Sequence, residues 1–177
     1  KLIFDPKSGE ILGAQGIGIE GVDKRIDIIA TAIRGGITAP ELADLELAYA
    51  PPFGSAKDPV NMLGYVAENV LSGVSKVAQW HEIDEYREKG YELLDVRSEE
   101  EVEEIAIPQA INIDFYKGQG FVYLVDELDK SKNYYVYCLA GGRSAQACNI
   151  MNQMGFETTY NLMGGFSEWD GPVDVLK

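Results

Sequence analysis

The sequence has few cysteines and histidines and no long apolar run. Its 177 residues contain one histidine and only two cysteines, Cys138 and Cys148. Two cysteines are too few for a disulfide-stapled fold, and no group of residues predicts a metal site. No basic-plus-apolar leader and no uninterrupted apolar run of membrane-spanning length is visible. These absences predict a reducing, cytoplasmic setting and no membrane partner.

Basic residues are also scarce. Lys and Arg number 15 against 29 Asp and Glu, which gives a net charge of −14. Such a chain lacks the basic surface that neutralises phosphates, so no nucleic-acid partner is predicted, and anionic membranes should repel it. Hydrophobic residues make up 46% of the chain, enough to bury a core. The chain begins directly in a strand-like segment, Lys1–Asp5, so we expect a piece of a longer protein.

Small residues near 71–76 interrupt the apolar pattern and suit a linker. They predict a first segment at 1–72, a linker at 73–76 and a domain at 77–177. In the first segment we expect a hairpin followed by two helices, the second beginning at Asp58-Pro59, a favourable cap followed by a favourable first residue.

The second part alternates strand and helix signals at short intervals, which is typical of a parallel α/β sheet with its ligand site at the carboxyl ends of the strands. The expected strands lie at 77–81, 92–96, 110–113, 133–138 and 158–162. The expected helices lie at 83–89, 98–104 and 143–154, and Ser98 with Glu101 fits a capping box at the start of the second.

A glycine-rich segment, 16–21, satisfies the dinucleotide fingerprint G-x-G-x-x-G, and Glu41 follows at a suitable distance. The fingerprint requires a second parallel strand that ends at the acid, whereas Thr38–Leu42 resembles a turn into a helix. We favour a bent, glycine-rich strand here and keep cofactor binding as the alternative.

The strongest chemical signal follows the expected strand at 133–138. The strand ends at Cys138, two glycines follow, and Arg143 and Ser144 open a helix. Backbone N–H groups of a tight loop at a helix N-terminus, together with a nearby arginine, lower a cysteine pKa and favour the nucleophilic thiolate. The alternative is an unreactive buried cysteine at a strand end. Residues 131–156 contain no Asp or Glu, which leaves room for one small anion.

The other cysteine and the single histidine give weaker signals. Cys148 shares a helix face with Ser144, where burial is the default, and a resolving partnership with Cys138 is the alternative. His81 ends the first expected strand, and its spacing gives no support to a Cys–His catalytic pair.

Residues 138–144 resemble the active-site loop of rhodanese (sulfurtransferase) domains, and four further segments extend the resemblance over about residues 76–177. The segments are Leu93–Arg97, Ile107-Pro108, Ala110–Ile113, and Asn161–Gly165 before Trp169. The resemblance implies a rhodanese-like parallel sheet flanked by helices. The related dual-specificity phosphatases have one more residue in the loop, so phosphatase activity is disfavoured.

In this family the loop cysteine accepts a sulfane sulfur as a persulfide and passes it to a nucleophile, so Cys138 would be catalytic. The implied ligand is a small sulfur-containing anion or a persulfide. The implied binding loop comprises Leu139, Ala140, Gly141, Gly142, Arg143 and Ser144. Asp95 and Arg97 would support that loop, with the Asp95 carboxylate serving loop amides or Arg143; the alternative is a plain surface ion pair. One departure is Ala106-Ile107-Pro108-Gln109-Ala110, where the family usually has His-Ile-Pro-Gly-Ala.

Residues 21–27 and 48–61 resemble the C-terminal dimerisation domain of FAD-dependent pyridine nucleotide-disulfide oxidoreductases, with coenzyme A disulfide reductases as the nearest group. Segment 1–72 would be a truncated α+β part of that domain. FAD, NAD(P)H and coenzyme A are implied only for a full-length parent, no cofactor is expected in this chain, and the reductase half-reaction is not possible in it. The resemblance implies that a tyrosine of this domain approaches the partner subunit's thiol site, and Tyr49 is a candidate counterpart; the favoured alternative is an aromatic residue packed at a subunit interface.

Two functions follow from these resemblances. The first is a sulfurtransferase that carries sulfane sulfur on Cys138 and passes it to a thiol or cyanide. The alternative is a non-catalytic dimerisation and docking module. In either case we expect self-association through residues 1–72, because a truncated domain leaves apolar surface poorly covered.

Overall fold

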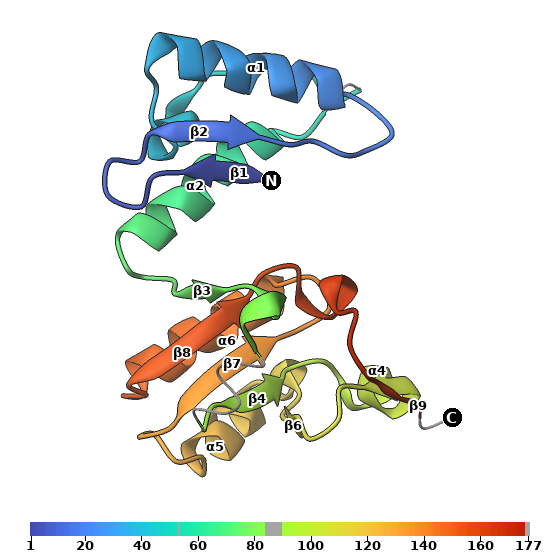
Figure 1. Cartoon of the computed structure of the whole chain (residues 1–177). Helices are drawn as coiled ribbons and strands as arrows, with labels where there is room; N and C mark the ends of the chain where they lie inside the picture. The colour runs from blue at the N-terminus through green and yellow to red at the C-terminus, as the bar shows by residue number, and fades with distance from the viewer. Residues whose placement is uncertain (53, 84–89, 176–177) are drawn as a thin grey trace. The chain divides into compact units, whose positions relative to one another are not determined.

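The computed structural model describes residues 1–52, 54–83 and 90–175 (Figure 1). The chain forms two compact units, Lys1–Val74 and Ser75–Lys177. The division lies within the segment 73–76 that the sequence suggests as a linker. No helix in the described ranges is long and apolar enough to cross a membrane.

Unit 1 is an antiparallel hairpin packed with helices. Strands β1 (Leu2–Phe4) and β2 (Ile11–Ala14) pair with each other. The helical elements are α1 (Val22–Gly35), the 3-10 helix η1 (Pro40–Asp44) and α2 (Pro59–Leu71). The buried core of the unit draws on all of these elements except β1, which packs partly buried side chains against it. Its members are Ile11, Ile29, Ala32, Ala39, Leu42, Val60 and Ala67.

Local sequence explains the ends of the unit 1 helices. Asp58 caps α2, since its side chain accepts a hydrogen bond from the Val60 N–H at 3.0 Å and Asn61 Oδ1 accepts one from the Asp58 N–H at 3.2 Å. Helix α1 ends at Gly35 and is capped by Gly36, whose φ of 72° is left-handed. The second helix therefore begins at the predicted residue.

Unit 2 is built on one five-stranded parallel sheet with the order β3-β8-β7-β4-β6 (Figure 1). In chain order the strands are β3 (Val77–Ala78), β4 (Glu92–Asp95), β6 (Ile111–Asn112), β7 (Asn133–Tyr137) and β8 (Thr158–Leu162). The predicted parallel α/β sheet is confirmed. Because β7 lies at the centre, the residue that follows it stands at the middle of the carboxyl edge.

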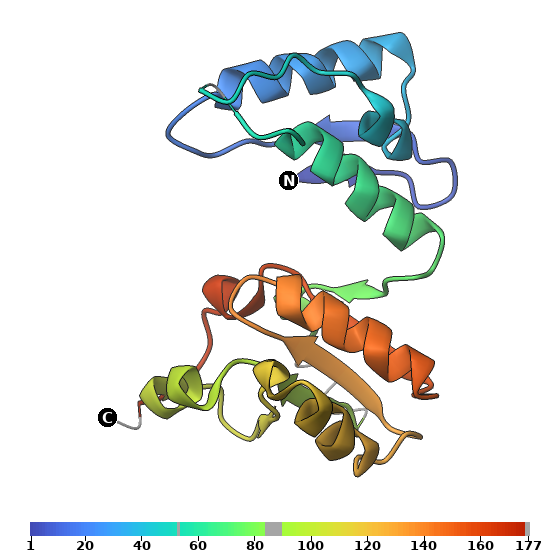
Figure 2. The ribbon, with the colours of Figure 1, turned by 180° about the vertical axis from the view of Figure 1, so that it is seen from behind.

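Helices α5 (Gln119–Asp126) and α6 (Gly142–Gln153) cover one face of this sheet (Figure 2). Their buried side chains pack against Tyr134, Val136 and Cys138 from the central strand and its end. The opposite face packs Tyr135 and Tyr137 against the 3-10 helices η2 (Trp80–Glu82) and η4 (Gly165–Glu168). The alternation along β7 thus points Cys138 towards the helical face.

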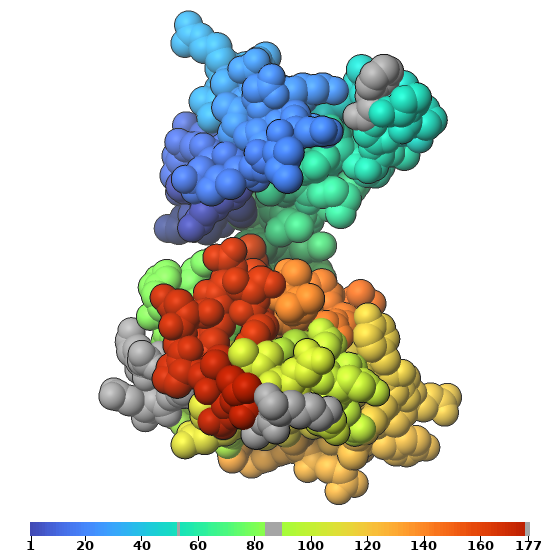
Figure 3. Space-filling view, turned by 90° about the vertical axis from the view of Figure 1, so that its right-hand side faces the viewer, coloured from blue at the N-terminus to red at the C-terminus, as the bar shows by residue number. Residues whose placement is uncertain are grey.

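A smaller layer lies beside the carboxyl edge. Helix α4 (Glu99–Glu104) leads directly into β5 (Ile105–Ala106), which pairs antiparallel with β9 (Asp174–Val175), so β9 lies close to α4 (Figure 3). The 3-10 helix η3 (Phe115–Lys117) follows β6. Between β5 and β6, Gln109 adopts a left-handed φ of 65°, at the place where the resembled family usually has glycine.

Several sequence expectations differ from the structure. Helix α5 was not predicted, because its sequence QGFVYLVD is rich in residues that favour strands and has glycines at its start. The helix expected at 83–89 lies outside the described residues except for Ile83. The fingerprint segment 16–21 follows an antiparallel strand, and the residues after α1 form an antiparallel bridge, Glu10 with Thr38, rather than a second parallel strand.

Candidate functional site

Cys138 follows β7 at the centre of the carboxyl edge of the sheet, and residues 139–141 turn the chain into α6. Gly141 makes the turn possible with a left-handed φ of 98°. The Cys138 side chain is only 2% exposed, whereas Leu139 in the next position is 48% exposed. The sulfur therefore lies beneath a loop whose outer rim reaches solvent.

The loop directs hydrogen-bond donors at this sulfur. The Gly141 N–H donates to Cys138 Sγ at 3.1 Å, and the Ser144 hydroxyl lies 3.5 Å from the same atom. Burial raises the pKa of the Cys138 thiol, but hydrogen bonds from the Ser144 hydroxyl and from the N–H groups of Ser144, Ala140 and Gly141 outweigh it. The net pKa lies below the usual value, because these donors stabilise the thiolate.

A buried amide holds the loop from the neighbouring strand. Asn161 on β8 donates through Nδ2 to the Gly141 carbonyl at 3.2 Å and accepts through Oδ1 from the Ser144 hydroxyl at 2.6 Å. A hydroxyl carries one proton, so Asn161 and the Cys138 sulfur share a single donor on Ser144. Asn161 thereby fixes both the loop backbone and the side chain that faces the sulfur.

The segment around η4 holds the start of the loop. The Phe166 N–H donates to the Cys138 carbonyl at 2.7 Å, and the Ser167 N–H donates to the Leu139 carbonyl at 3.0 Å. Gly165 permits this approach: its φ is +57°, and a Cβ added there would meet the Cys138 carbonyl oxygen. The two backbone segments are in direct contact at this point.

Asp95 and Arg97 form a buried ion pair at the end of β4, with side chains 1% and 2% exposed. Arg97 Nη2 lies 2.7 Å from Asp95 Oδ2, and Nε lies 3.1 and 3.0 Å from Oδ1 and Oδ2. The partner of Asp95 is therefore Arg97, where the sequence suggested the loop amides or Arg143. The Asp95–Arg97 ion pair is also buried, and so differs from the surface ion pair that was the alternative. The Arg97 guanidinium lies 4.1 Å from the centre of the Phe166 ring, so it contacts the residue that holds the Cys138 carbonyl.

Arg143 has a different acidic partner from the expected one. Its Nη1 and Nη2 lie 2.6 and 2.7 Å from the two carboxylate oxygens of Glu101 on α4. The Tyr116 ring lies against the same guanidinium, with its centre 5.3 Å away. Arg143 is therefore at the loop, as expected, but its charge is already matched.

Cys148 lies in the core under the sheet and is 3% exposed. Burial raises the pKa of its thiol to about 12, so it stays protonated at neutral pH. Both cysteines are free thiols. The single histidine, His81, is exposed in η2. In the part of the chain that the structure describes, no cluster of three His, Cys, Asp or Glu residues suits a metal ion.

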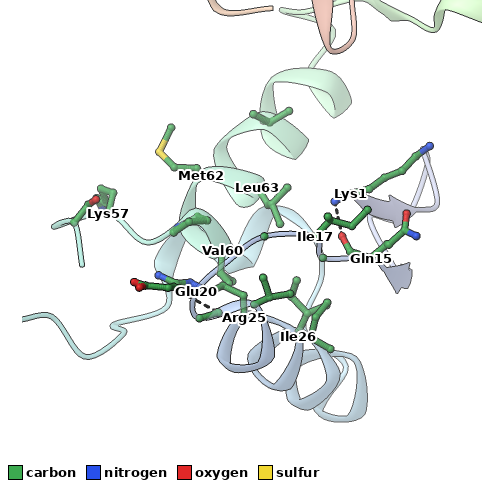
Figure 4. Close-up of a pocket in the computed structure, with 18 residues that line it drawn as sticks. Lys1, Gln15, Ile17, Glu20, Arg25, Ile26, Lys57, Val60, Met62 and Leu63 are labelled. Carbon is green, nitrogen blue, oxygen red and sulfur yellow. Dashed lines mark hydrogen bonds between the residues drawn. The ribbon is translucent and has the colours of Figure 1, made fainter. Parts of the chain in front are cut away.

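Unit 1 carries an open cavity of about 740 Å³ between the 16–21 loop, α1 and α2 (Figure 4). Ile17, Ile26, Val60 and Leu63 give it a largely apolar wall, and Lys1 and Lys57 stand at its margin (Figure 4). Ile17 is 91% exposed. Tyr49 lies outside this lining, 54% exposed in the segment between η1 and α2.

Sequence reasoning did not assign roles to Asn161, Gly165 or Glu101. The first two lie in the segment Asn161–Gly165, which was recognised only as a motif. Glu101 was recognised only as a helix-capping residue. Asn161 lies 20 residues from its loop partner Gly141, Gly165 lies 27 residues from Cys138, and Glu101 lies 42 residues from Arg143. A local sequence pattern does not predict contacts over such separations.

Comparison with known proteins matches both units. Residues 79–171 match the family model of the rhodanese-like domain. Residues 1–59 match that of the pyridine nucleotide-disulphide oxidoreductase dimerisation domain. A coenzyme A disulfide reductase of Staphylococcus aureus (strain bovine RF122 / ET3-1) is 44% identical over 68 residues, which are 38% of this chain and 16% of that protein.

Two solved structures resemble almost the whole chain. Reduced Bacillus anthracis CoADR-RHD matches 93% of this chain and 29% of its own, with 44% identity and a TM-score of 0.86. The NAD-dependent persulfide reductase from A. fulgidus matches 95% of this chain and 29% of its own, with 39% identity and a TM-score of 0.79. The chain thus spans less than a third of the length of these relatives.

Proposed function

Because the chain belongs to the rhodanese-like domain family, whose model matches residues 79–171, we propose that it is a sulfurtransferase with Cys138 as its sulfur carrier. The observation that carries the proposal is the cradle around Cys138 Sγ. The Gly141 N–H lies 3.1 Å from the sulfur and the Ser144 hydroxyl 3.5 Å from it, in a site that is nearly closed to water. The same donors that favour a thiolate suit a persulfide anion.

The proposed reaction has two displacements. The Cys138 thiolate attacks the sulfane sulfur of thiosulfate, a polysulfide or a coenzyme A persulfide, and a new S–S bond forms. The old S–S bond breaks, and the leaving group departs with the electron pair, as sulfite from thiosulfate. An acceptor thiolate or cyanide then attacks the outer sulfur, and the Cys138 thiolate is released.

Persulfide mass spectrometry tests this assignment. After incubation with excess donor and removal of small molecules, we expect an added mass of about 32 Da on the peptide that contains Cys138, the mass of one sulfur atom. Cys138→Ala should abolish the added mass and the formation of thiocyanate from cyanide. Cys148→Ala is the matched control and should retain both. Sulfur found only on Cys148, or unchanged turnover in Cys138→Ala, would contradict the proposal.

The names of the relatives favour a role for this chain within a longer reductase. One is named a coenzyme A disulfide reductase and another an NAD-dependent persulfide reductase. We propose that this chain serves as the sulfur-carrying part of such a reductase, whose FAD, NAD(P)H and coenzyme A sites would lie in the rest of the parent. The segment 16–21 does not fit a dinucleotide, because no parallel strand follows it in the described part of unit 1. The proposed chemistry therefore uses no cofactor on this chain.

A second role concerns unit 1. Its residues 1–59 match a dimerisation domain, and its apolar cavity opens beside exposed Ile17 and Ile19. We propose that residues 1–72 associate with a second copy of the chain over this surface. If the chain associates and Cys138 proves unreactive, the non-catalytic dimerisation and docking module is the better description.

A further inference from the structure

Glu101 is the carboxylate that meets the cation of the candidate loop. Arg143 is the only charged residue between Cys138 and Ser144. Both of its terminal nitrogens are bonded to Glu101, at 2.6 and 2.7 Å, and the two side chains are 16% and 32% exposed. A paired, partly buried guanidinium has little attraction left for a second anion.

The Glu101 carboxylate is held in place by its own helix. The carboxylate accepts a hydrogen bond from the Ser98 N–H at 2.9 Å. The backbone N–H of Glu101 donates to the Ser98 hydroxyl at 3.3 Å, which completes the capping box of α4. The centre of the Tyr116 ring lies 5.3 Å from the same guanidinium. The Glu101 carboxylate is thus held by its own helix as well as by Arg143.

The pair also stays charged. The hydrogen bond from Arg143 lowers the pKa of Glu101 to about 2, and the carboxylate raises the pKa of Arg143. Within α4, Glu101 is the glutamate that contacts Arg143, whereas Glu99 pairs with Lys117. A donor that reaches Cys138 thus meets a neutralised arginine next to a sulfur that must itself be anionic to react.

We propose that Glu101 determines the donor specificity of Cys138 by neutralising Arg143, so that the loop discriminates against dianionic donors such as thiosulfate. The favoured donors are hydropersulfides of small thiols, which carry at most one charge at the reacting sulfur. This inference rests on the proposed sulfur-carrier role of Cys138 and names the donor class for it. Glu101 acts through Arg143 and is a positioning residue.

The favoured step balances without a further reactant. The Cys138 thiolate attacks the outer sulfur of R–S–SH and forms a new S–S bond with it, the donor S–S bond breaks, and R–S⁻ leaves with the electron pair, so that Cys138 becomes the hydropersulfide Cys–S–SH. One negative charge is present before and after the transfer. With thiosulfate, the same attack brings three negative charges together, and the repulsion is large where no free cation offsets it.

A comparison of the two donor classes in wild type and Glu101→Gln tests the proposal. The full chain is loaded with either thiosulfate or 2-hydroxyethyl hydropersulfide, and the rate of persulfide formation on Cys138 is followed by mass spectrometry. We expect Glu101→Gln to raise the second-order rate with thiosulfate about tenfold or more, because a unit charge close to the dianion is lost. The rate with the hydroxyethyl donor should change less than about threefold, and added salt should reduce the thiosulfate gain.

Two further variants separate charge from structure. Glu104→Gln removes the same charge from an exposed position on α4 and should leave the donor ratio nearly unchanged. Glu101→Asp keeps the carboxylate and should keep most of the discrimination. Equal changes for both donors in Glu101→Gln, or a loss of discrimination in Glu101→Asp as large as that in Glu101→Gln, would overturn the inference. Failure of both donors to load wild-type Cys138 would instead refute the proposed function, and the inference with it.

Discussion

At the scale of single residues, the chemistry of the loop depends on one shared proton. The Ser144 hydroxyl lies 2.6 Å from Asn161 Oδ1 and 3.5 Å from Cys138 Sγ, so the amide is its nearer acceptor while the sulfur is a thiol. When the sulfur becomes anionic, it attracts the same proton more strongly. The side chain of Ser144 is therefore able to respond to the charge on Cys138 without moving out of its buried position.

Ser144→Ala should raise the pKa of the Cys138 thiol, because the hydroxyl is one of the donors that stabilise the thiolate. The ionised fraction at a given pH then falls, and the pH–rate profile of Cys138 alkylation shifts to higher pH. We expect a roughly several-fold slower reaction at neutral pH, the effect of losing one hydrogen bond to a charged group. Ser167→Ala is the control, since its hydroxyl bonds to the Leu139 carbonyl and not to the sulfur. An unchanged or acid-shifted profile would count against this role.

Gln109→Gly should stabilise the protein. Gln109 has a φ of 65°, which is strained for a side chain with a Cβ and free of strain for glycine. After the entropy that glycine costs, we expect a gain of about 0.5–1 kcal/mol in the free energy of unfolding, measured in urea. Gln146→Gly, at an exposed position within α6, should instead lose about 1 kcal/mol. Destabilisation by both changes would show that the side chain of Gln109 makes a contact worth more than its strain.

At the scale of elements, the loop is positioned by three other elements of unit 2. Asn161 on β8 holds Gly141, the η4 segment holds the Cys138 and Leu139 carbonyls, and Glu101 on α4 holds Arg143. Each anchor comes from a different element, so the geometry of the loop depends on the assembled sheet rather than on its local sequence.

Gly165→Ala tests this arrangement. A Cβ at Gly165 would meet the Cys138 carbonyl oxygen, and the left-handed φ is itself unfavourable for alanine. We expect a loss of about 2–4 kcal/mol in the free energy of unfolding and slower alkylation of Cys138. Gly142→Ala is the matched control for stability, because a Cβ there meets no atom within 4 Å. Normal stability and reactivity in Gly165→Ala would show that the close contact between the η4 segment and the loop after Cys138 is not needed for either property.

The sequence patterns predicted the parts of the fold that depend on local sequence. The apolar runs at β4, β7 and β8, and the Asp58-Pro59 start of α2, lie where they were expected. Helix α5 was missed because Phe121, Val122 and Tyr123 favour strands, and burial of Phe121 against the sheet decides in favour of the helix.

The candidate site was predictable to a similar extent. The run from Cys138 to Ser144 is contiguous, so its glycines and arginine could be recognised without a structure. The partner of Arg143 could not, because several acids compete for it in the sequence and only the placement of α4 selects Glu101. The pairing of Asp95 with Arg97 likewise follows from burial of both side chains at the end of one strand.

At the scale of the whole molecule, the two units carry different surfaces. Unit 1 exposes apolar residues around its cavity, whereas the candidate loop of unit 2 lies close to an acidic helix. Because we propose association for unit 1 and sulfur transfer for unit 2, we expect a substitution in one unit to leave the role of the other unchanged.

Ile17→Asp should weaken self-association of the chain by about tenfold or more, because burial of one isoleucine contributes roughly 1.5–3 kcal/mol. Sedimentation velocity over a range of concentrations measures the shift towards monomer. Val175→Asp is the control, since this residue is also apolar and 68% exposed but belongs to unit 2. Persulfide formation on Cys138 should be unaffected by either change. A wild-type chain that stays monomeric at all concentrations would refute the proposed association.

The junction between the units has a direct connection to the sulfur site. Unit 2 begins at Ser75, and the carbonyl of the next residue, Lys76, accepts a hydrogen bond from the Asn161 N–H at 2.9 Å. The Asn161 side chain in turn holds the Gly141 carbonyl. Asn161 therefore joins the first residues of unit 2 to the loop around Cys138, through its backbone on one side and its side chain on the other.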